Sequence, residues 1–201
     1  MVYRIPAVNL VGRGCLAQLK DEIGTLGCKK ALVVSDKFLT ENGVVEKVTK
    51  VLDQVGIEHT LYNDVKQNPS VANVEGGLEV LKKENCDFIV SIGGGSPQDC
   101  GKAISVLATN GGKITDYEGV NKSQKKCLPI VAIATTAGTS AEVTINYVIT
   151  DEETHIKMIM VDRNTLASIT VNDPELMLSK PAGLTAATGM DALTHAIEGY
   201  T

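Results

Sequence analysis

The stretch from Asp87 to Ile104, DFIVSIGGGSPQDCGKAI, most restricts what this chain can fold into. It begins with an apolar run rich in β-branched residues, 88–92, which has the length of a strand buried on both faces. Three glycines follow, and Ser96 and Pro97 are then expected as the N-cap and first residue of a helix. Glycines let the backbone approach a phosphate, and a helix N-terminus favours negative charge. The stretch therefore predicts a phosphate-binding turn, although three glycines can also form a plain strand-to-helix connection.

Strand-like and helix-like segments alternate on both sides of this turn. Further strands are expected at 5–11, 30–35, 57–62, 129–135 and 166–171, and further helices at 15–26, 44–55 and 71–84. Such alternation is typical of an α/β fold, here a Rossmann-like parallel sheet with helices on both faces. Two more strand-like runs, 143–150 and 157–161, flank a polar turn and are expected to form a hairpin.

The texture of the sequence changes after Pro181, where a helical pattern runs from 184 to 200 with no strand after it. We expect residues 1–180 to form a dinucleotide-binding α/β domain. Residues 181–201 are expected to begin a second, helical part of the protein. The apolar face of that helix has little sequence left to pack against, so the chain is interpreted as the N-terminal part of a longer protein.

Composition and charge narrow the classes of partner. The 201 residues carry a net charge of −5, no basic run, 3% aromatic residues and no Trp, which argues against a nucleic-acid partner. No apolar stretch is long enough to span a bilayer, and the N-terminus lacks a signal-peptide core, so no membrane partner is expected. The five cysteines are scattered and never in C-x-x-C spacing, which is typical of free thiols in a reducing compartment. We expect a cytoplasmic protein.

Polar residues follow several of the expected strands. Asp36 ends the strand 30–35, where a carboxylate can bind adenosine ribose hydroxyls and repel a 2′-phosphate, or can simply terminate the strand in a turn. Asn68 stands at a strand-to-helix junction, and residues 135–140, TTAGTS, end another strand. Ligands of open α/β sheets bind at the carboxyl ends of the strands, so the coincidence of these segments with the glycine turn favours a binding site.

Asp191 and His195 form the one pair with the spacing of metal ligands. At i and i+4 of a helix they lie on one face, close enough to bind one divalent ion. The alternative is a hydrogen bond on the helix surface, because many helices carry such pairs by chance. The other histidines, His59 and His155, are expected to be structural. No residue is assigned as a general acid or base, so no catalytic residue is predicted.

Five segments together resemble the iron-containing, group III alcohol dehydrogenases. They are VGRG at 11–14, KALVVSDK at 30–37, IGGGSPQDCGKAI at 92–104, TTAGTSAEVTINYVITDEE at 135–153 and AATGMDALTHAIEGY at 186–200. The resemblance implies an oxidoreductase that reversibly reduces a short-chain aldehyde, such as lactaldehyde, to an alcohol or diol. It also implies NAD and Fe²⁺, or in some members Zn²⁺, as cofactors, and a homodimer or higher homo-oligomer. Residues 181–201 would then be the first helix of a truncated all-helical, metal-binding domain.

The resemblance also implies roles for individual residues. Asp36 matches the position that prefers NAD over NADP. Asp191 and His195 match the first two of four metal ligands, and the other two are histidines on later helices, beyond Thr201. We therefore expect this chain alone to be inactive. The residues on or beside dinucleotide-contacting positions are Asp36, Asn68, Gly94, Gly95, Ser96, Thr135, Thr136, Thr139, Thr144 and Lys157.

Three alternatives stay open at the level of sequence. The chain could be a dinucleotide-binding module without catalysis. It could be a different enzyme of the same layout, like glycerol dehydrogenase or dehydroquinate synthase, although the glycine and threonine motifs favour the alcohol dehydrogenases. It could also exchange its N-terminal strand between subunits, because the expected strand at 5–11 begins near a proline and so suits a sheet edge.

Overall fold

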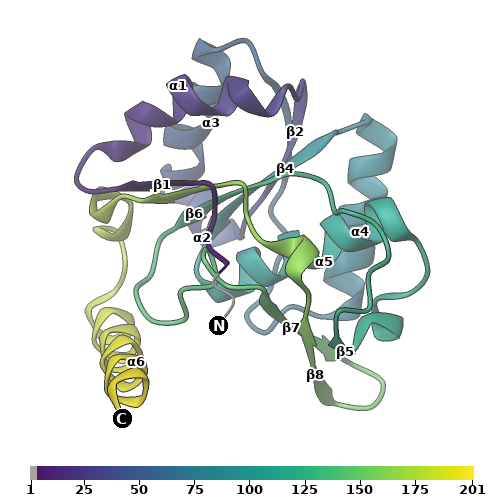
Figure 1. The fold of residues 1–201 in the computed structure, drawn as a ribbon. Coiled ribbons are helices and arrows are strands. Elements are labelled where there is room, and N and C mark those ends of the chain that lie inside the picture. Colours follow the sequence, from purple (N-terminus) through teal and green to yellow (C-terminus); the bar gives the residue numbers. More distant parts are fainter. Residues whose placement is uncertain (1–3) are drawn as a thin grey trace.

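A sheet of six parallel strands forms the centre of the molecule in the computed structural model, which describes residues 4–201 (Figure 1). The first three residues of the expected 1–180 domain therefore lie outside the described residues. In spatial order the strands are β1 (Val8–Val11), β9 (Ile169–Asn172), β6 (Ile130–Ala134), β4 (Phe88–Gly93), β2 (Lys30–Val34) and β3 (Glu58–Tyr62). Every neighbouring pair is parallel, as the alternating sequence pattern predicts.

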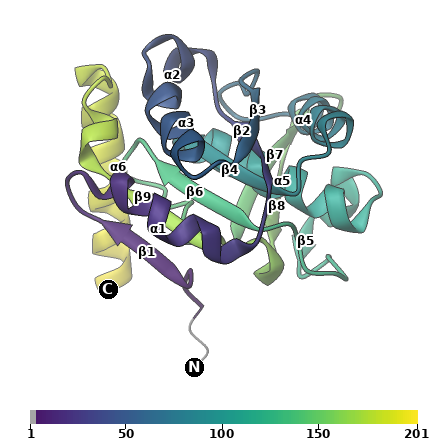
Figure 2. The ribbon, with the colours of Figure 1, turned by 90° about the horizontal axis from the view of Figure 1, so that it is seen from above.

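Helices cover both faces of this sheet, which confirms the predicted Rossmann-like class (Figures 1 and 2). Ala31 and Val33 of β2 point into a core shared with α1 (Leu19–Ile23) and α3 (Val44–Gln54). Their neighbours Leu32 and Val34 point into the opposite core. That second core includes residues of α4 (Val71–Glu84) and α5 (Gly95–Asn110). All four side chains are fully buried, as is usual for a central strand of a parallel sheet.

A smaller sheet packs beside α5. The expected hairpin is present as β7 (Asn146–Asp151) and β8 (Ile156–Val161), which pair antiparallel. A two-residue strand, β5 (Gly119–Val120), adds to the edge of β8 and was not anticipated from the sequence. Tyr147 and Met160 are buried in the same core as Ile104 of α5, so the hairpin is joined to the main domain by apolar packing.

Some helical expectations were wrong in detail. The segment 15–26 is broken into the 3₁₀ turns Cys15–Gln18 and Gly24–Leu26 around α1, and the short helix α2 (Lys37–Glu41) was missed. Other 3₁₀ turns are Ile114–Tyr117, Arg163–Thr165 and Pro174–Met177. The N-cap of α5 is Gly94, not Ser96: Gly93 reverses the chain at φ 155°, and the Gly94 carbonyl then accepts the first helical bond from Gln98 N at 3.4 Å.

Helix α6 (Ala182–Tyr200) follows Pro181 and projects away from the main sheet (Figure 1). None of its residues is buried, and it exposes the apolar side chains of Leu184, Met190, Leu193 and Ile197. The helix expected from the sequence is therefore present, with its apolar side chains unpacked in this chain. Within residues 4–201, no helix combines the length and the apolar character needed to cross a membrane.

Candidate active site

A cleft of about 470 Å³ opens at the carboxyl ends of β2, β4 and β6. Its walls come from the residues just after these strands, from the loop that follows β3, and from α6 and the segment before it. The lining residues are Asp36, Phe38, Leu39, Val65, Lys66, Gln67, Gly94, Gly95, Ser96, Pro97, Thr135, Thr136, Ala137, Thr139, Leu176, Ser179, Lys180, Leu184, Thr188 and Asp191. This edge of an open α/β sheet is where ligands bind.

The glycine turn forms one wall of the cleft. The N–H groups of Gly95 and Ser96 lie in the first turn of α5, where the helix itself offers them no acceptor. A Cβ on Gly94 would come within 2.9 Å of Thr136 Oγ1, and one on Gly95 within 3.3 Å of Thr139 Cγ2. The turn and the threonine loop therefore touch with little room for a side chain, and Gly95 and Ser96 line the cleft directly. This arrangement fits a phosphate group.

Buried hydrogen bonds hold the turn in place. Gln98, on α5, is 2% exposed and donates from Nε2 to the carbonyl oxygen of Ile133 at 3.0 Å, while its Oε1 accepts from the Ser91 hydroxyl. Gly93 accepts from Thr135 N at 3.0 Å, which joins the ends of β4 and β6. The helix N-terminus is thus fixed against two strands before any ligand binds.

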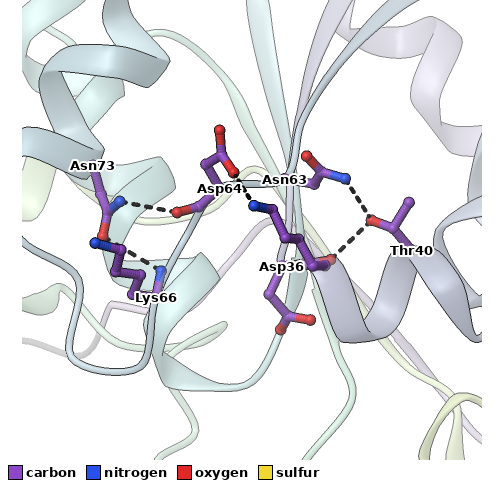
Figure 3. A network of polar contacts seen from close by, with 7 residues as sticks. Asp36, Thr40, Asn63, Asp64, Lys66 and Asn73 are labelled. Atoms are coloured by element: carbon purple, nitrogen blue, oxygen red, sulfur yellow. Dashed lines mark hydrogen bonds and ion pairs between the residues drawn. The ribbon is translucent and has the colours of Figure 1, made fainter.

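Asp36 also lines the cleft and is the N-cap of α2; it is drawn with its neighbour Thr40 in Figure 3. Its Oδ1 accepts from Leu39 N at 2.8 Å, and its carbonyl oxygen accepts from Thr40 Oγ1 at 2.8 Å. Asn63, which follows β3, donates in turn to Thr40 Oγ1 at 3.3 Å. The cap uses Oδ1, so among the described residues Oδ2 is left available to a ligand.

Three of the residues predicted to contact the cofactor lie outside the lining of the cleft. Asn68, at φ 55°, accepts on Oδ1 from Lys157 Nζ at 2.9 Å, and its own N–H donates to Ser96 Oγ at 3.3 Å. Asn68 and Lys157 are therefore joined to the glycine turn through Ser96. Thr144 instead accepts from Lys102 below the turn, on Oγ1 at 3.3 Å and on its carbonyl oxygen at 2.9 Å.

A set of charged groups near the turn, with Lys102 buried and Asp99 and Glu142 partly buried, was missed from the sequence. Lys102 is completely buried, and besides Thr144 it donates to the carbonyl oxygen of Asn146 at 2.7 Å. Burial lowers the pKa of Lys102 to about 8. Burial also raises the pKa of Asp99 to about 6 and shifts the pKa of Glu142 upward, while the Lys102 charge opposes both shifts. These groups tie α5 to the start of β7.

Asp191 and His195 lie on α6 with Oδ1 and Nε2 separated by 3.6 Å. Two ligands about 2.1 Å from one tetrahedral ion lie about 3.4 Å apart, so the pair fits a shared Fe²⁺ or Zn²⁺. Asp191 lines the first cleft and His195 lines a second of about 490 Å³, and Thr136 and Ala137 belong to the walls of both. Among residues 4–201, no group of three or more His, Cys, Asp or Glu side chains is placed to hold a metal.

Sequence reasoning also missed several lining residues. Lys66 and Gln67 follow β3, and Lys180 and Thr188 flank the start of α6. The strand order carried a signal for the first two, because β3 ends at the same edge of the sheet as β2. Lys180 Nζ donates to Thr188 Oγ1 at 3.2 Å, a contact that has no sequence signature of its own.

A parallel α/β sheet with a glycine turn at a helix N-terminus and a carboxylate after the neighbouring strand defines the class of dinucleotide-binding folds. The sequence profile of the iron-containing alcohol dehydrogenase family matches residues 6–174. The chain belongs to this family, as its motifs predict. The match favours the alcohol dehydrogenases over the glycerol dehydrogenase and dehydroquinate synthase alternatives.

Individual relatives support this assignment. The chain is 54% identical over 198 residues to alcohol dehydrogenase 4 of Schizosaccharomyces pombe, covering 98% of this chain and 47% of the relative. It is 46% identical over 198 residues to NAD-dependent methanol dehydrogenase of Bacillus methanolicus, with 98% and 52% covered. It is 47% identical over 191 residues to lactaldehyde reductase of Escherichia coli K12, with 94% and 50% covered.

Solved structures agree with the sequence matches. A 1,3-propanediol oxidoreductase superposes with a TM-score of 0.95 at 46% identity, covering 98% of this chain and 51% of that one. Sulfoacetaldehyde reductase from Bifidobacterium kashiwanohense, in complex with NAD⁺, superposes with a TM-score of 0.90 at 35% identity, with 99% and 53% covered. The chain thus spans about half the length of the relatives it matches.

Proposed function

We propose that this chain is the dinucleotide-binding part of an NAD- and metal-dependent oxidoreductase. The whole protein would reversibly reduce a short-chain aldehyde, such as lactaldehyde, to an alcohol or diol. One observation carries the proposal: a single cleft is bordered by the glycine turn, by Asp36 and by the metal-ligand candidate Asp191. The names of the relatives, among them a lactaldehyde reductase and an NAD-dependent methanol dehydrogenase, support the same reaction class.

Different residues of the cleft would bind different parts of the dinucleotide. The N–H groups of Gly95 and Ser96 would bind the pyrophosphate, and the free oxygen of Asp36 would accept from the adenosine ribose. Thr135, Thr136 and Thr139 line the cleft beside the glycine turn. Asn68, Thr144 and Lys157 would contact the cofactor beyond Ser96, on the side of the β7–β8 hairpin. When bound, NAD supplies the hydride acceptor or donor.

Asp191 and His195 would hold the metal, Fe²⁺ or Zn²⁺. A carboxylate oxygen and an imidazole nitrogen are suitable donors for either ion. When bound, the ion supplies a Lewis acid for the oxygen of the aldehyde or alcohol. No side chain of this chain is assigned as a general acid or base.

Three further properties remain predictions. The domain boundary near residue 180 is proposed from Pro181 and from the absence of buried residues in α6. A homodimer or higher homo-oligomer is proposed from the family resemblance. A cytoplasmic location is proposed from the five cysteines, which are free thiols in the described chain.

Calorimetry with NAD tests the first part of the proposal. The 201-residue chain is expected to bind one equivalent of NAD, and a chain that bound none would contradict the assignment of the cleft. A second assay asks whether this chain alone catalyses the reaction or only binds the dinucleotide. It follows NADH oxidation with lactaldehyde and Fe²⁺. Because this chain supplies only two metal ligands, we expect no turnover from it, and turnover would show that the two-ligand count is wrong.

A further inference from the structure

An ion pair lies beside the carboxylate that is assigned to the adenosine ribose. Lys37, the residue after Asp36, places its Nζ 3.0 Å from Asp64 Oδ1. The two side chains are 68% and 62% exposed, so the pair is open to solvent and to a ligand. Neither residue of the pair lines the cleft itself, but their neighbours in the chain do: Asp36 and Phe38 flank Lys37, and Val65 follows Asp64. The pair therefore lies at the rim of the ribose end.

The backbone on both sides of the pair is held by buried or capping contacts (Figure 3). Lys37 is the first residue of α2, whose N-terminus is capped by Asp36. The carbonyl oxygen of Asp64 accepts from Asn73 Nδ2 at 2.9 Å. Asn73 is 6% exposed and completes the capping box of α4 with Ser70. The Asp64 carboxylate is thus presented to Lys37 by a rigid loop.

We propose that Asp64 is a second residue that selects NAD over NADP, acting by engaging Lys37. This inference rests on the proposed function and names the dinucleotide that the same site accepts. A 2′-phosphate on the adenosine ribose would approach Asp36, and Lys37 is the cation that follows Asp36 in the chain. Asp64 occupies that cation and adds a second negative charge, so Asp36, Lys37 and Asp64 together carry a charge of −1.

The expected effect of Asp64 on the dissociation constant for NADP is small, because the ion pair of Lys37 and Asp64 is exposed to solvent. Exposed ion pairs contribute about 0.2–1 kcal/mol, which corresponds to a change of up to about fivefold in a dissociation constant. Removal of Asp36 alone leaves Lys37 and Asp64 neutral as a pair. Removal of both carboxylates leaves Lys37 free beside the phosphate, with Lys66 on the adjoining wall of the cleft. Full acceptance of NADP therefore requires both changes.

The test measures the ratio of the dissociation constants for NADP and NAD by calorimetry at low salt, where exposed charges are least screened. The variants are D36G, D36G/D64N and D36G/D64N/K37M, and glycine is suitable at position 36 because it is tolerated at an N-cap. The matched control is D36G/D53N. Asp53 is 64% exposed and pairs with His59 at 3.0 Å, on α3 and β3 and outside the cleft lining.

We expect D36G/D64N to lower the ratio by up to about fivefold below that of D36G, and D36G/D53N to leave it unchanged. Adding K37M should restore the D36G ratio. The inference is overturned if D36G/D64N matches D36G/D53N, or if the gain survives K37M. A wild-type chain that bound neither dinucleotide would overturn the proposed function together with the inference. NAD binding by the wild type with an unchanged ratio in D36G/D64N would overturn the inference alone.

Discussion

The carboxylate of Asp191 lies so close to the backbone of Gly138 that a Cβ at Gly138 would overlap Asp191 Oδ2. Gly138 belongs to the threonine loop after β6, at φ 116°, and Asp191 belongs to α6. The same Cβ would lie 3.1 Å from the carbonyl oxygen of Thr188. The threonine loop that lines the cleft therefore also contacts the first metal-ligand candidate, so the proposed dinucleotide and metal sites meet at Gly138.

Gly138→Ala should destabilise the chain by about 1–3 kcal/mol, because alanine rarely adopts this φ and its Cβ has no space. Urea unfolding measures the loss. The matched control is Gly189→Ala in α6, where a Cβ meets nothing within 4 Å and alanine should instead stabilise by about 0.5–1 kcal/mol. A Gly138→Ala protein as stable as the wild type would show that the loop and α6 do not hold this contact in solution.

Gly95→Val should weaken NAD binding at least tenfold, about 1.4 kcal/mol, because the side chain would fill the approach to the helix N-terminus. The turn is already tight, since a Cβ there lies 3.3 Å from Thr139 Cγ2. Gly24→Val, where a Cβ has open space, is the control and should bind NAD normally. The phosphate-turn assignment fails if Gly95→Val retains both its melting temperature and its NAD affinity.

Local sequence signatures were enough to predict most of the fold and part of the site. The strand, glycine and helix sequence at 88–104 carries its own geometry, and the polar turn between β7 and β8 marks a hairpin. Asp36 was recognised because it ends a buried strand. The α2 helix and β5 were missed because five and two residues are too short to show a periodicity.

Features that depend on distant partners had no such signature. Lys102 reads as an ordinary helix lysine, and its burial follows only from the carbonyl oxygens of Thr144 and Asn146, 42 and 44 residues away. The role proposed for Asp64 likewise depends on its ion pair with Lys37, which lies on another element. The N-cap of α5 is Gly94 and not Ser96 because of the φ angle of Gly93. A run of three glycines does not specify that angle.

The partly buried Asp99 should give the chain a pH-dependent stability. Burial raises its pKa from 3.8 to about 6, so between these values the folded protein keeps a proton that the unfolded chain releases. Wild type should therefore lose about 1–3 kcal/mol relative to Asp99→Asn as the pH rises from about 4 to about 6. Lys102, with its pKa lowered to about 8, stays charged throughout this window.

Urea unfolding of both proteins at pH 4, 5, 6 and 7 checks this expectation, because other titrating groups cancel in the difference. The asparagine can still accept the hydrogen bond from Val148 N, which is 3.1 Å from Asp99 Oδ2. The difference in the free energy of unfolding between wild type and Asp99→Asn could stay constant with pH, or could change in favour of wild type as the pH rises. Either result would show that Asp99 is not desolvated as described.

Metal retention follows from the number of ligands that this chain supplies. Asp191 and His195 offer one carboxylate oxygen and one imidazole nitrogen, and their side chains are 45% and 59% exposed. An ion held by these two groups fills its other positions with water, and α6 has no buried residue to fix it, which adds an ordering cost. We expect weak, rapidly exchanging metal, measured as less than one equivalent by mass spectrometry after gel filtration in metal-free buffer.

His195→Ala should abolish the weak Zn²⁺ binding seen by calorimetry, whereas His59→Ala, at the comparable pair with Asp53, should leave it unchanged. One full equivalent of iron or zinc retained through gel filtration, or equal losses in the two histidine variants, would show that further ligands or a different site hold the metal.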